Sequence, residues 1–384
     1  MLFVFLVVSG TAIGQSPYRV INDYQLGLSQ PYPYFYINTV SAPVFNDSGQ
    51  VGYILSNQTS QSFSGSVELR AGAADYRIGS YFYSASNPST GNMDGSLSLN
   101  GANRIIHSAK QSSTGQFQYQ TTYIADSTGT LKLVRLTQNP SDVILFSSQA
   151  FNSAGQIAFL NGKAVNVYNG SGIVTIANSD TSNYQPVVND AGSVAWGTTT
   201  GIMIDPAGPA GPTPILGSSL VTVPANLIGF VAEYLSINES NQVAFEGSDY
   251  HFYVGTSTDA PRMLNGVIGS TQPGARDAIS INESGAVAIG TIGAGLYFAA
   301  ANETNVTPIL KYGDAFDNST IKSLSILDSG LNNHNQIAFN YTLANGQIGV
   351  AVIQVVPEIS SMLLSLMGLM GLTVFIRLRL NGRQ

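Results

Sequence analysis

The chain has 384 residues, with 15 Lys and Arg against 22 Asp and Glu, which gives a formal net charge of −7 at pH 7. This negative charge argues against nucleic acid as a partner, and the absence of cysteine excludes disulfides and thiolate metal sites. Charged residues make up only 10% of the chain, against roughly 25% in a typical soluble domain, and 40 residues are glycine, a composition that predicts an all-β fold of short strands joined by polar turns.

The N-terminus is typical of a secretory signal peptide. An apolar run from Leu2 to Val8 is followed by the small-residue pattern Ala12-Ile13-Gly14. This order predicts cleavage after Gly14, so we expect residues 1–14 to be a signal peptide and the protein to be exported. No Lys or Arg precedes the apolar run, and a buried first strand is the alternative interpretation.

A short turn pattern recurs seven times between Phe45 and Ile337. In each copy an apolar residue is followed by Asn, Gly or Asn stands three positions later, and the next strand starts with Val or Ile. We expect the Asn side chain to bind backbone donors two residues on, and the Gly or Asn to adopt positive φ. The turn residues are, in pairs, Asn46 and Gly49, Asn100 and Asn103, Asn152 and Gly155, Asn189 and Gly192, Asn238 and Asn241, Asn282 and Gly285, and Asn332 and Asn335.

The spacing of these turns predicts a seven-bladed β-propeller over residues 15–355. The mean spacing is about 48 residues, close to the roughly 40–50 of one propeller blade. In the third repeat we expect antiparallel strands at Ile157–Leu160, Lys163–Tyr168 and Ile173–Ala177, with a fourth near Tyr184–Val188. A β-helix and a stacked β-sandwich are the alternative architectures.

Propellers often complete their last blade with a strand from the N-terminus. We expect Tyr34–Val40 to pair beside Ile348–Val355 and close the ring.

The C-terminus predicts a membrane anchor. Val356-Pro357-Glu358 precedes an uncharged run from Ile359 to Ile376, which is followed by Arg377, Arg379 and Arg383. As a helix the run spans about 27 Å, enough for a bilayer core, and the arginines favour a cytoplasmic end with the body outside. We therefore expect residues 356–384 to form a transmembrane sorting segment.

The order of Pro357 and Glu358, apolar run, Arg377 and Arg379 resembles the PEP-CTERM sorting signal of Gram-negative bacteria, although Ile359 stands where a second proline is usual. The resemblance implies a cell-surface location, an exosortase-type processing enzyme as partner, and a link to exopolysaccharide and biofilm. A plain tail anchor is the alternative. The repeats over roughly residues 40–355 resemble a family of tandem-repeat extracellular proteins named for the motif Asn-x-x-Gly-x-x-Ala-Phe, which implies an architecture but no reaction.

Residues with catalytic or metal-binding potential are sparse. The three histidines, His107, His251 and His334, have no partner at metal-ligand spacing, and no phosphate loop, nucleophile elbow or calcium loop is present, so we expect no catalytic, cofactor or metal residues. The acidic turn residues are expected to form a ring at one end of a propeller, either as solvated groups or as a weak cation site; they are Asp47, Asp190, Glu239 and Glu283.

Two aromatic clusters either form strand core or stack on sugar rings; they are Tyr32, Tyr34, Phe35 and Tyr36, and Tyr81, Phe82 and Tyr83. The leading functional hypothesis is a non-enzymatic surface protein that binds or organises extracellular polysaccharide. One alternative is a carbohydrate-active enzyme with paired carboxylates in the central funnel of the propeller. Another is a protein-binding propeller, which the fold alone does not distinguish.

Overall fold

The computed structural model describes residues 18–26, 31–32, 35–36, 39–58, 62–71, 74–84, 97–112, 117–126, 131–134, 136, 144–179, 185–198, 201–206, 219–221, 235–247, 249–256, 258–269 and 277–356. The regular structure in these residues is all β, which confirms the predicted fold class. No helix in this part of the chain is long and apolar enough to cross a membrane. The predicted signal peptide and the predicted C-terminal span lie outside the described residues.

The chain divides into two compact units, one formed by Val20–Gln354 and one by Met1–Arg19 with Val355–Gln384. The sheets and the site described below belong to the first unit. Its described strands form seven sheets of four or five strands, together with a two-stranded ribbon of β2 (Pro31–Tyr32) and β3 (Phe35–Tyr36).

The first three sheets follow one another along the chain. The first contains β4 (Thr39–Val40), β5 (Val44–Phe45), β6 (Gln50–Gln58), β7 (Ser62–Ala71) and β8 (Ala74–Ser84). The second contains β9 (Leu97–Leu99), β10 (Arg104–Ser112), β11 (Phe117–Asp126) and β12 (Leu131–Val134). The third contains β13 (Ile144–Leu145), β14 (Ile157–Asn161), β15 (Ala164–Tyr168) and β16 (Ile173–Asn178).

Four more sheets continue the series. The fourth contains β17 (Val187–Val188), β18 (Val194–Thr198), β19 (Gly201–Asp205) and β20 (Ser219–Val221), and the fifth β21 (Leu235–Ile237), β22 (Val243–Glu246), β23 (Phe252–Gly255) and β24 (Arg262–Leu264). The sixth contains β25 (Ala278–Ile281), β26 (Val287–Thr291), β27 (Gly295–Ala299) and β28 (Thr307–Lys311). The seventh contains β29 (Ala315–Phe316), β30 (Ser319–Ser325), β31 (Gln336–Leu343) and β32 (Ile348–Val355), with β1 (Tyr18–Gln25) beside β32.

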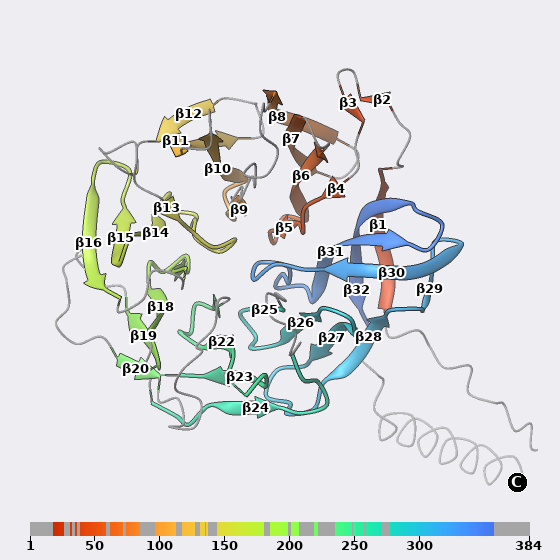
Figure 1. Cartoon of the computed structure of the whole chain (residues 1–384). Helices are drawn as coiled ribbons and strands as arrows, with labels where there is room; N and C mark the ends of the chain where they lie inside the picture. The colour runs from red at the N-terminus through yellow and green to blue at the C-terminus, as the bar shows by residue number, and fades with distance from the viewer. Residues whose placement is uncertain are drawn as a thin grey trace, which may run out of the picture. The chain divides into compact units, whose positions relative to one another are not determined.

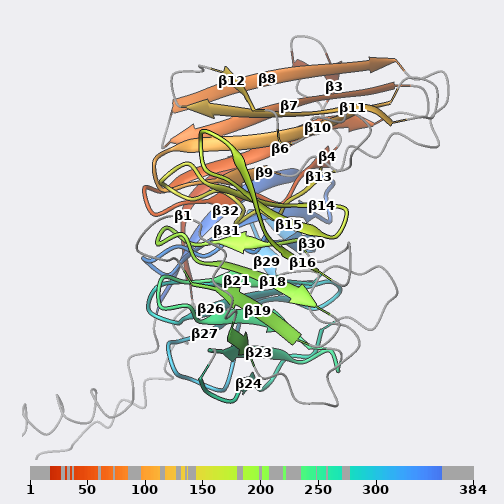
Figure 2. The same cartoon turned by 90° about the vertical axis from the view of Figure 1, so that its left-hand side faces the viewer.

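Consecutive sheets lie side by side around a central axis (Figure 1), and the view turned by 90° shows them stacked face against face (Figure 2). Apolar clusters fill the spaces between neighbouring sheets; one of them joins Val187 and Ile202 of the fourth sheet to Phe245 of the fifth. Another joins Tyr53 of the first sheet to Val350 of the seventh, so the first and last sheets also pack together. A circle of antiparallel meanders about an axis is a β-propeller.

A small residue at a constant place lets the sheets approach closely. Five repeats have Ala after the first Val or Ile of the strand that follows the turn, and all five side chains are fully buried; they are Ala158, Ala195, Ala244, Ala288 and Ala338. The large residues beside them are also buried, as Phe159 and Trp196 show. Since successive residues of a strand face opposite sides, the small and large side chains fill two different inter-sheet spaces.

One expectation about strand order is wrong. The segment at Val187–Val188 is not the fourth strand of the third sheet, because it pairs with Val194 and Ala195 of the fourth sheet. The segment before each Asn turn pairs with the strand after it, so each turn lies inside one sheet.

The ring is closed by a different segment from the one expected. Thr39–Val40 pairs with β6 of the first sheet, whereas β1 lies beside β32 in the seventh. The backbone N–H of Leu26 donates to the carbonyl of Ile348 over 2.9 Å, and Leu26 and Tyr24 pack on the cluster between the first and last sheets. An N-terminal strand therefore does complete the last sheet, but it begins further upstream than expected.

Candidate functional site

The repeated Asn residues form a closed ring of hydrogen bonds. Each side-chain amide donates to the backbone carbonyl of the Asn in the next repeat. The donors and acceptors are Asn46 to Asn100 (3.1 Å), Asn100 to Asn152 (2.8 Å), Asn152 to Asn189 (3.0 Å), Asn189 to Asn238 (2.9 Å), Asn238 to Asn282 (3.0 Å), Asn282 to Asn332 (3.1 Å) and Asn332 to Asn46 (3.5 Å). We call this set the Asn ring; all its members are buried.

Each of these Asn side chains also holds its own turn. In repeat one, Oδ1 of Asn46 accepts the backbone N–H of Gln50 at 2.9 Å, and in repeat six Oδ1 of Asn282 accepts the backbone N–H of Ala286 at 3.0 Å. The same bond to the fourth residue on is present in the other five repeats. Asn is suited to this place because its short side chain carries both a donor and an acceptor.

The position three residues after the Asn has positive φ in every turn. The angles are 77° at Gly49, 61° at Asn103, 89° at Gly155, 89° at Gly192, 59° at Asn241, 82° at Gly285 and 55° at Asn335. Gly and Asn are the residues that adopt this conformation at the lowest cost, which accounts for their alternation at this place.

The residues that follow the ring Asn form a second series of contacts between repeats. Asp47 accepts the backbone N–H of Asn333 (2.7 Å), and Asn333 accepts that of Glu283 (2.8 Å). Glu283 accepts the N–H of Glu239 (2.9 Å), Glu239 that of Asp190 (2.6 Å), and Asp190 that of Ser153 (2.6 Å). The acidic turn residues therefore do lie at one end of the ring, and they bind the neighbouring turns through their carboxylates.

This second series is interrupted in repeat two, where the corresponding residue is Gly101. A Cβ atom at Gly101 would lie 2.8 Å from Oγ of Ser153, so a larger residue requires a shift of that side chain. Arg104 joins the second and third repeats instead, since its Nη2 donates to the carbonyl of Ser153 over 3.0 Å and its guanidinium lies 5.4 Å from the centre of the Phe151 ring.

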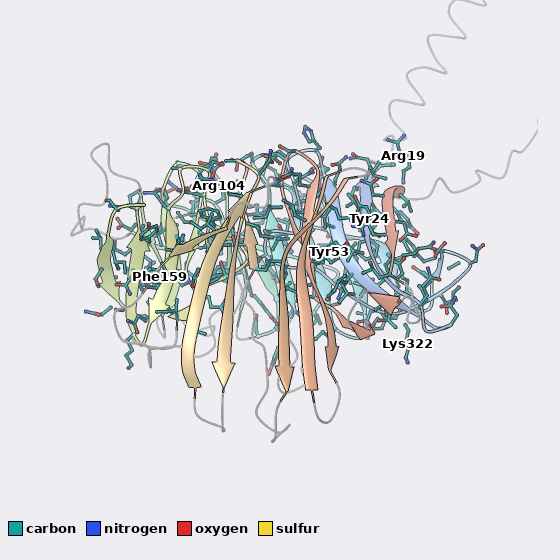
Figure 3. The ribbon with its side chains drawn as sticks, turned by 90° about the horizontal axis from the view of Figure 1, so that it is seen from above. Arg19, Tyr24, Tyr53, Arg104, Phe159 and Lys322 are labelled. Atoms are coloured by element: carbon teal, nitrogen blue, oxygen red, sulfur yellow. The ribbon has the colours of Figure 1, made fainter. Side chains whose placement is uncertain are left out.

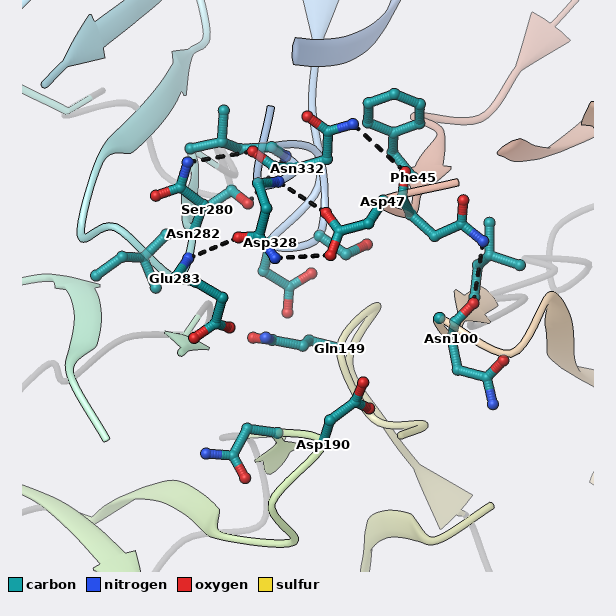
Figure 4. Close-up of a pocket in the computed structure, with 18 of the residues that line it drawn as sticks. Phe45, Asp47, Asn100, Gln149, Asp190, Ser280, Asn282, Glu283, Asp328 and Asn332 are labelled. Carbon is teal, nitrogen blue, oxygen red and sulfur yellow. Dashed lines mark hydrogen bonds between the residues drawn. The ribbon is translucent and has the colours of Figure 1, made fainter. Parts of the chain in front are cut away.

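The seven turns surround a cavity of about 130 Å³, which we call the turn cup (Figure 4). The acidic residues that line it are Asp47, Asp190, Glu239, Glu283 and Asp328, and none of its described lining residues is Lys, Arg or His. Burial is the main cause that raises the pKa of Glu283, and the negative charges of Glu239, Asp47 and Asp190 raise it further, against the lowering effect of the Glu239 backbone N–H.

Two extra turns, from the third and seventh repeats, meet beneath the Asn ring. Ser148 donates from Oγ to the carboxylate of Asp328, and its Oγ accepts the backbone N–H of Ser329 at 3.2 Å. The amide of Gln149 reaches the fifth sheet, donating to the Ile237 carbonyl (2.6 Å) and accepting the Ile237 N–H (2.9 Å). These contacts connect sheets that are not neighbours in the ring and form the floor of the turn cup.

Asp328 is the most buried acid of this group, with 1% of its surface exposed. Burial raises its pKa to about 7, although the backbone N–H groups of Ser148 and Gln149 and the Ser147 hydroxyl favour the ionised form. Its Oδ2 has no hydrogen-bond partner among the described residues. Neither Asp328 nor Gln149 belongs to the repeated motif, so the sequence pattern could not identify them.

The other residues considered from the sequence are dispersed. Nδ1 of His251 lies 3.3 Å from the carboxylate of Asp249, His334 is exposed in the seventh turn, and His107 lies in β10 opposite Leu97 and Tyr123. Within the described ranges, no group of three or more His, Cys, Asp or Glu residues is placed to hold a metal ion by itself.

The aromatic clusters fall on two different sheets. Tyr32 pairs with Phe35 in the ribbon that also contains Tyr36, and Tyr34 lies outside the described residues. Tyr81, Phe82 and Tyr83 lie in β8, opposite Gly65, Ser64 and Phe63. The sorting-signal residues Pro357, Glu358, Arg377 and Arg379 also lie outside the described residues.

No protein-family model and no curated protein sequence matches the chain. A solved structure described as "YCF48 bound to D1 peptide" is similar over 91% of this chain and 98% of that chain, with 9% identity and a TM-score of 0.45. Another, described as "The beta-propeller domain of the Trilobed protease from Pyrococcus furiosus reveals an open velcro topology", is similar over 82% of this chain and 95% of that chain, with 10% identity and a TM-score of 0.49. The sheet order and the closed Asn ring identify the fold of this chain independently of these two structures.

Proposed function

We propose that this chain is an exported, surface-anchored, seven-bladed β-propeller that binds or organises extracellular polysaccharide without chemical turnover. The observation that supports this proposal is a pair of neighbouring sheets with unusually long strands. β6, β7 and β8 have 9, 10 and 11 residues, and β10 and β11 have 9 and 10, whereas the strands of the third to sixth sheets have at most 6.

The long strands extend beyond the other sheets (Figure 3). Arg104, next to the Asn ring, pairs with Asp126, while Ser112 pairs with Phe117 at the far end of the same hairpin. The extensions therefore lie at the end of the propeller opposite the turn cup, and among the described strands they reach furthest outward on this face.

The extensions of the first sheet combine aromatic residues with uncharged polar residues. Residues 56–58, 62–67 and 79–84 contain no Asp, Glu, Lys or Arg. Phe63 pairs with Tyr83 and Gly65 with Tyr81, so these aromatic residues stand at neighbouring register positions of β7 and β8. Aromatic rings can stack on the faces of sugars, and hydroxyl and amide groups can bind sugar hydroxyls. This combination of residues in the extensions therefore suits an uncharged polysaccharide as ligand.

The two ends of the sequence support the proposed location. Residues 1–14 have the features of a signal peptide, and Ile359 to Ile376 with Arg377 and Arg379 those of a membrane anchor. We include in the proposal that an exosortase-type enzyme processes this tail, at a site near Pro357 and Glu358.

Size-exclusion chromatography tests the proposed ligand. The full-length chain, purified in detergent, is incubated with the exopolysaccharide of the producing organism, and both are followed through the column. We expect the protein to co-elute with intact polymer. A shift of the polymer to smaller sizes would instead support a carbohydrate-active enzyme, and independent elution would overturn the binding role.

A pair of substitutions locates the binding surface. Tyr81→Ala and Tyr83→Ala together are expected to reduce co-elution. Tyr250→Ala is the control, because Tyr250 is an exposed tyrosine (42%) in the turn between β22 and β23, away from the long strands. Equal loss in both variants would contradict the assignment to β8.

A further inference from the structure

The floor of the turn cup contains a buried carboxyl group whose hydrogen-bonding capacity the described residues do not fully satisfy. One carboxylate oxygen of Asp328 is bound by Ser148, but Oδ2 is buried without a hydrogen-bond partner among the described residues. Figure 4 shows Asp328 among Asp47, Glu283 and Gln149, inside the circle of lining residues. A buried polar atom left in this state costs free energy, and such atoms in native proteins usually have a water or ion as partner.

The walls of the turn cup add negative charge. The four turn carboxylates accept backbone hydrogen bonds from the neighbouring turns. Burial, the largest cause, raises the pKa of Glu283, and the nearby Glu239, Asp47 and Asp190 raise it further. No Lys, Arg or His is among the described lining residues, so no cationic side chain of these walls offsets the five acids. A cation in the cup would offset this negative charge.

We propose that the turn cup binds a divalent cation of the calcium type, with Oδ2 of Asp328 as its anionic ligand. The cavity of about 130 Å³ has room for an ion with several waters, each of which occupies about 30 Å³ in the liquid. The lining supplies oxygen ligands from carboxylates, hydroxyls and amides and no histidine or cysteine, which is the ligand chemistry that Ca²⁺ prefers.

The arrangement indicates a weak site. Among the described residues, no group of three or more His, Cys, Asp or Glu side chains is placed to hold a metal ion. We therefore assign the direct contact to Asp328 and expect the turn acids to attract the ion at longer range or through water. Extracellular calcium modules with few charged ligands have Kd values of about 10⁻⁴ to 10⁻³ M, and we expect this range. The inference concerns the end opposite the long strands, so it can fail while polysaccharide binding holds, and the reverse.

Calorimetric titration of the full-length chain with CaCl₂, after removal of bound metal and at constant ionic strength, tests the site. We expect Kd of about 10⁻⁴ to 10⁻³ M and a rise in Tm with added CaCl₂. Asp328→Asn should weaken binding at least about tenfold, since it removes the anionic ligand with little change of volume. Asp259→Asn should bind as the wild type does, because Asp259 is an exposed acid whose carboxylate accepts hydrogen bonds from Thr256 and Thr258 and does not line the turn cup.

No heat and no change of Tm up to about 10 mM CaCl₂ would overturn the proposal, as would undiminished binding by folded Asp328→Asn. If that variant does not fold, crystals of the wild-type chain soaked with Mn²⁺ or Tb³⁺ give an independent reading. An anomalous peak beside Asp328 supports the proposal, and peaks only elsewhere, or none, contradict it.

Discussion

The side-chain amide of Asn332 donates to the backbone carbonyl of Asn46 over 3.5 Å, across 286 residues of sequence. This bond joins the last turn to the first with the same chemistry that joins every other neighbouring pair. It is the longest bond of the Asn ring. It connects the seventh sheet to the first, which are brought together by packing between the two ends of the folded unit. The stability of the ring should therefore depend on the Asn donors and on the closing strand.

Asn282→Asp tests the donor of one ring member. The substitution keeps the acceptor for Ala286 but replaces the donor to the Asn332 carbonyl with a second acceptor, in a buried place. We expect the free energy of unfolding to fall by about 1–3 kcal/mol or more, measured by urea unfolding. Asn178→Asp, on an exposed residue of β16, is the control, and equal effects of the two substitutions would contradict a role for the ring donor.

Gly49 tests the conformational demand of the turns. Its φ is 77°, and a Cβ atom there would meet nothing within 4 Å, so substitution changes backbone strain alone. We expect Gly49→Asn to be nearly neutral, because Asn occupies the same place in repeats two, five and seven with positive φ. Gly49→Val should cost about 1–2 kcal/mol or more, and similar unfolding curves for the two variants would contradict this account.

Asp23 should make the closing strand sensitive to pH. Burial is the main cause that raises the pKa of this carboxyl, against the hydrogen bond from the Tyr341 hydroxyl (2.6 Å). Between its usual and its raised pKa the folded chain holds the proton more tightly than the unfolded chain, so the free energy of unfolding falls as pH rises through this window and is flat above it. Urea unfolding across a pH series should show this slope in the wild type and lose it in Asp23→Asn.

Tyr341→Phe provides the counterpart of that experiment. It removes a hydrogen bond that lowers the pKa of Asp23, so the window should extend to higher pH. A pH slope that is the same in the wild type, Asp23→Asn and Tyr341→Phe would show that another group is responsible.

Leu26→Ala should loosen the closing strand. Leu26 is 6% exposed and packs on the cluster between the first and last sheets, and loss of a buried leucine costs about 2–5 kcal/mol. Because β32 would become an unpaired edge when β1 detaches, we also expect association of chains, seen as earlier elution on size exclusion. Val20→Ala, on the same strand but 43% exposed, should change neither property by much.

The local parts of the fold follow from the sequence because their causes are local. Asn at the start of a turn and Gly or Asn three positions later predict the turn and its positive φ, and the alternation after the turn predicts the buried Ala158 and Phe159. In the third repeat the strands found at Ile157–Asn161, Ala164–Tyr168 and Ile173–Asn178 start and end within about a residue of the predicted bounds.

The long-range parts do not follow, because their partners are remote in sequence. The donor function of each Asn depends on a carbonyl in another repeat. β1 has no fully buried residue, and its sequence has no pattern that indicates β32 as its neighbour. Gln149 and Asp328 lie in turns that the described residues show in the third and seventh repeats, and their roles depend on the meeting of those turns inside the ring.

Every donor in the Asn ring points from one repeat to the next, so the ring has a direction but neither a beginning nor an end. The seven hydrogen bonds do not depend on where the polypeptide starts, because the bond from Asn332 to Asn46 is of the same kind as the bond from Asn282 to Asn332. A circularly permuted chain, with the old ends linked and new ends opened in an exposed loop such as Asn169–Gly172, would keep all seven of these hydrogen bonds. In the natural chain the two ends of the folded unit lie at β1 and β32, and they could be moved to another repeat without altering the Asn ring.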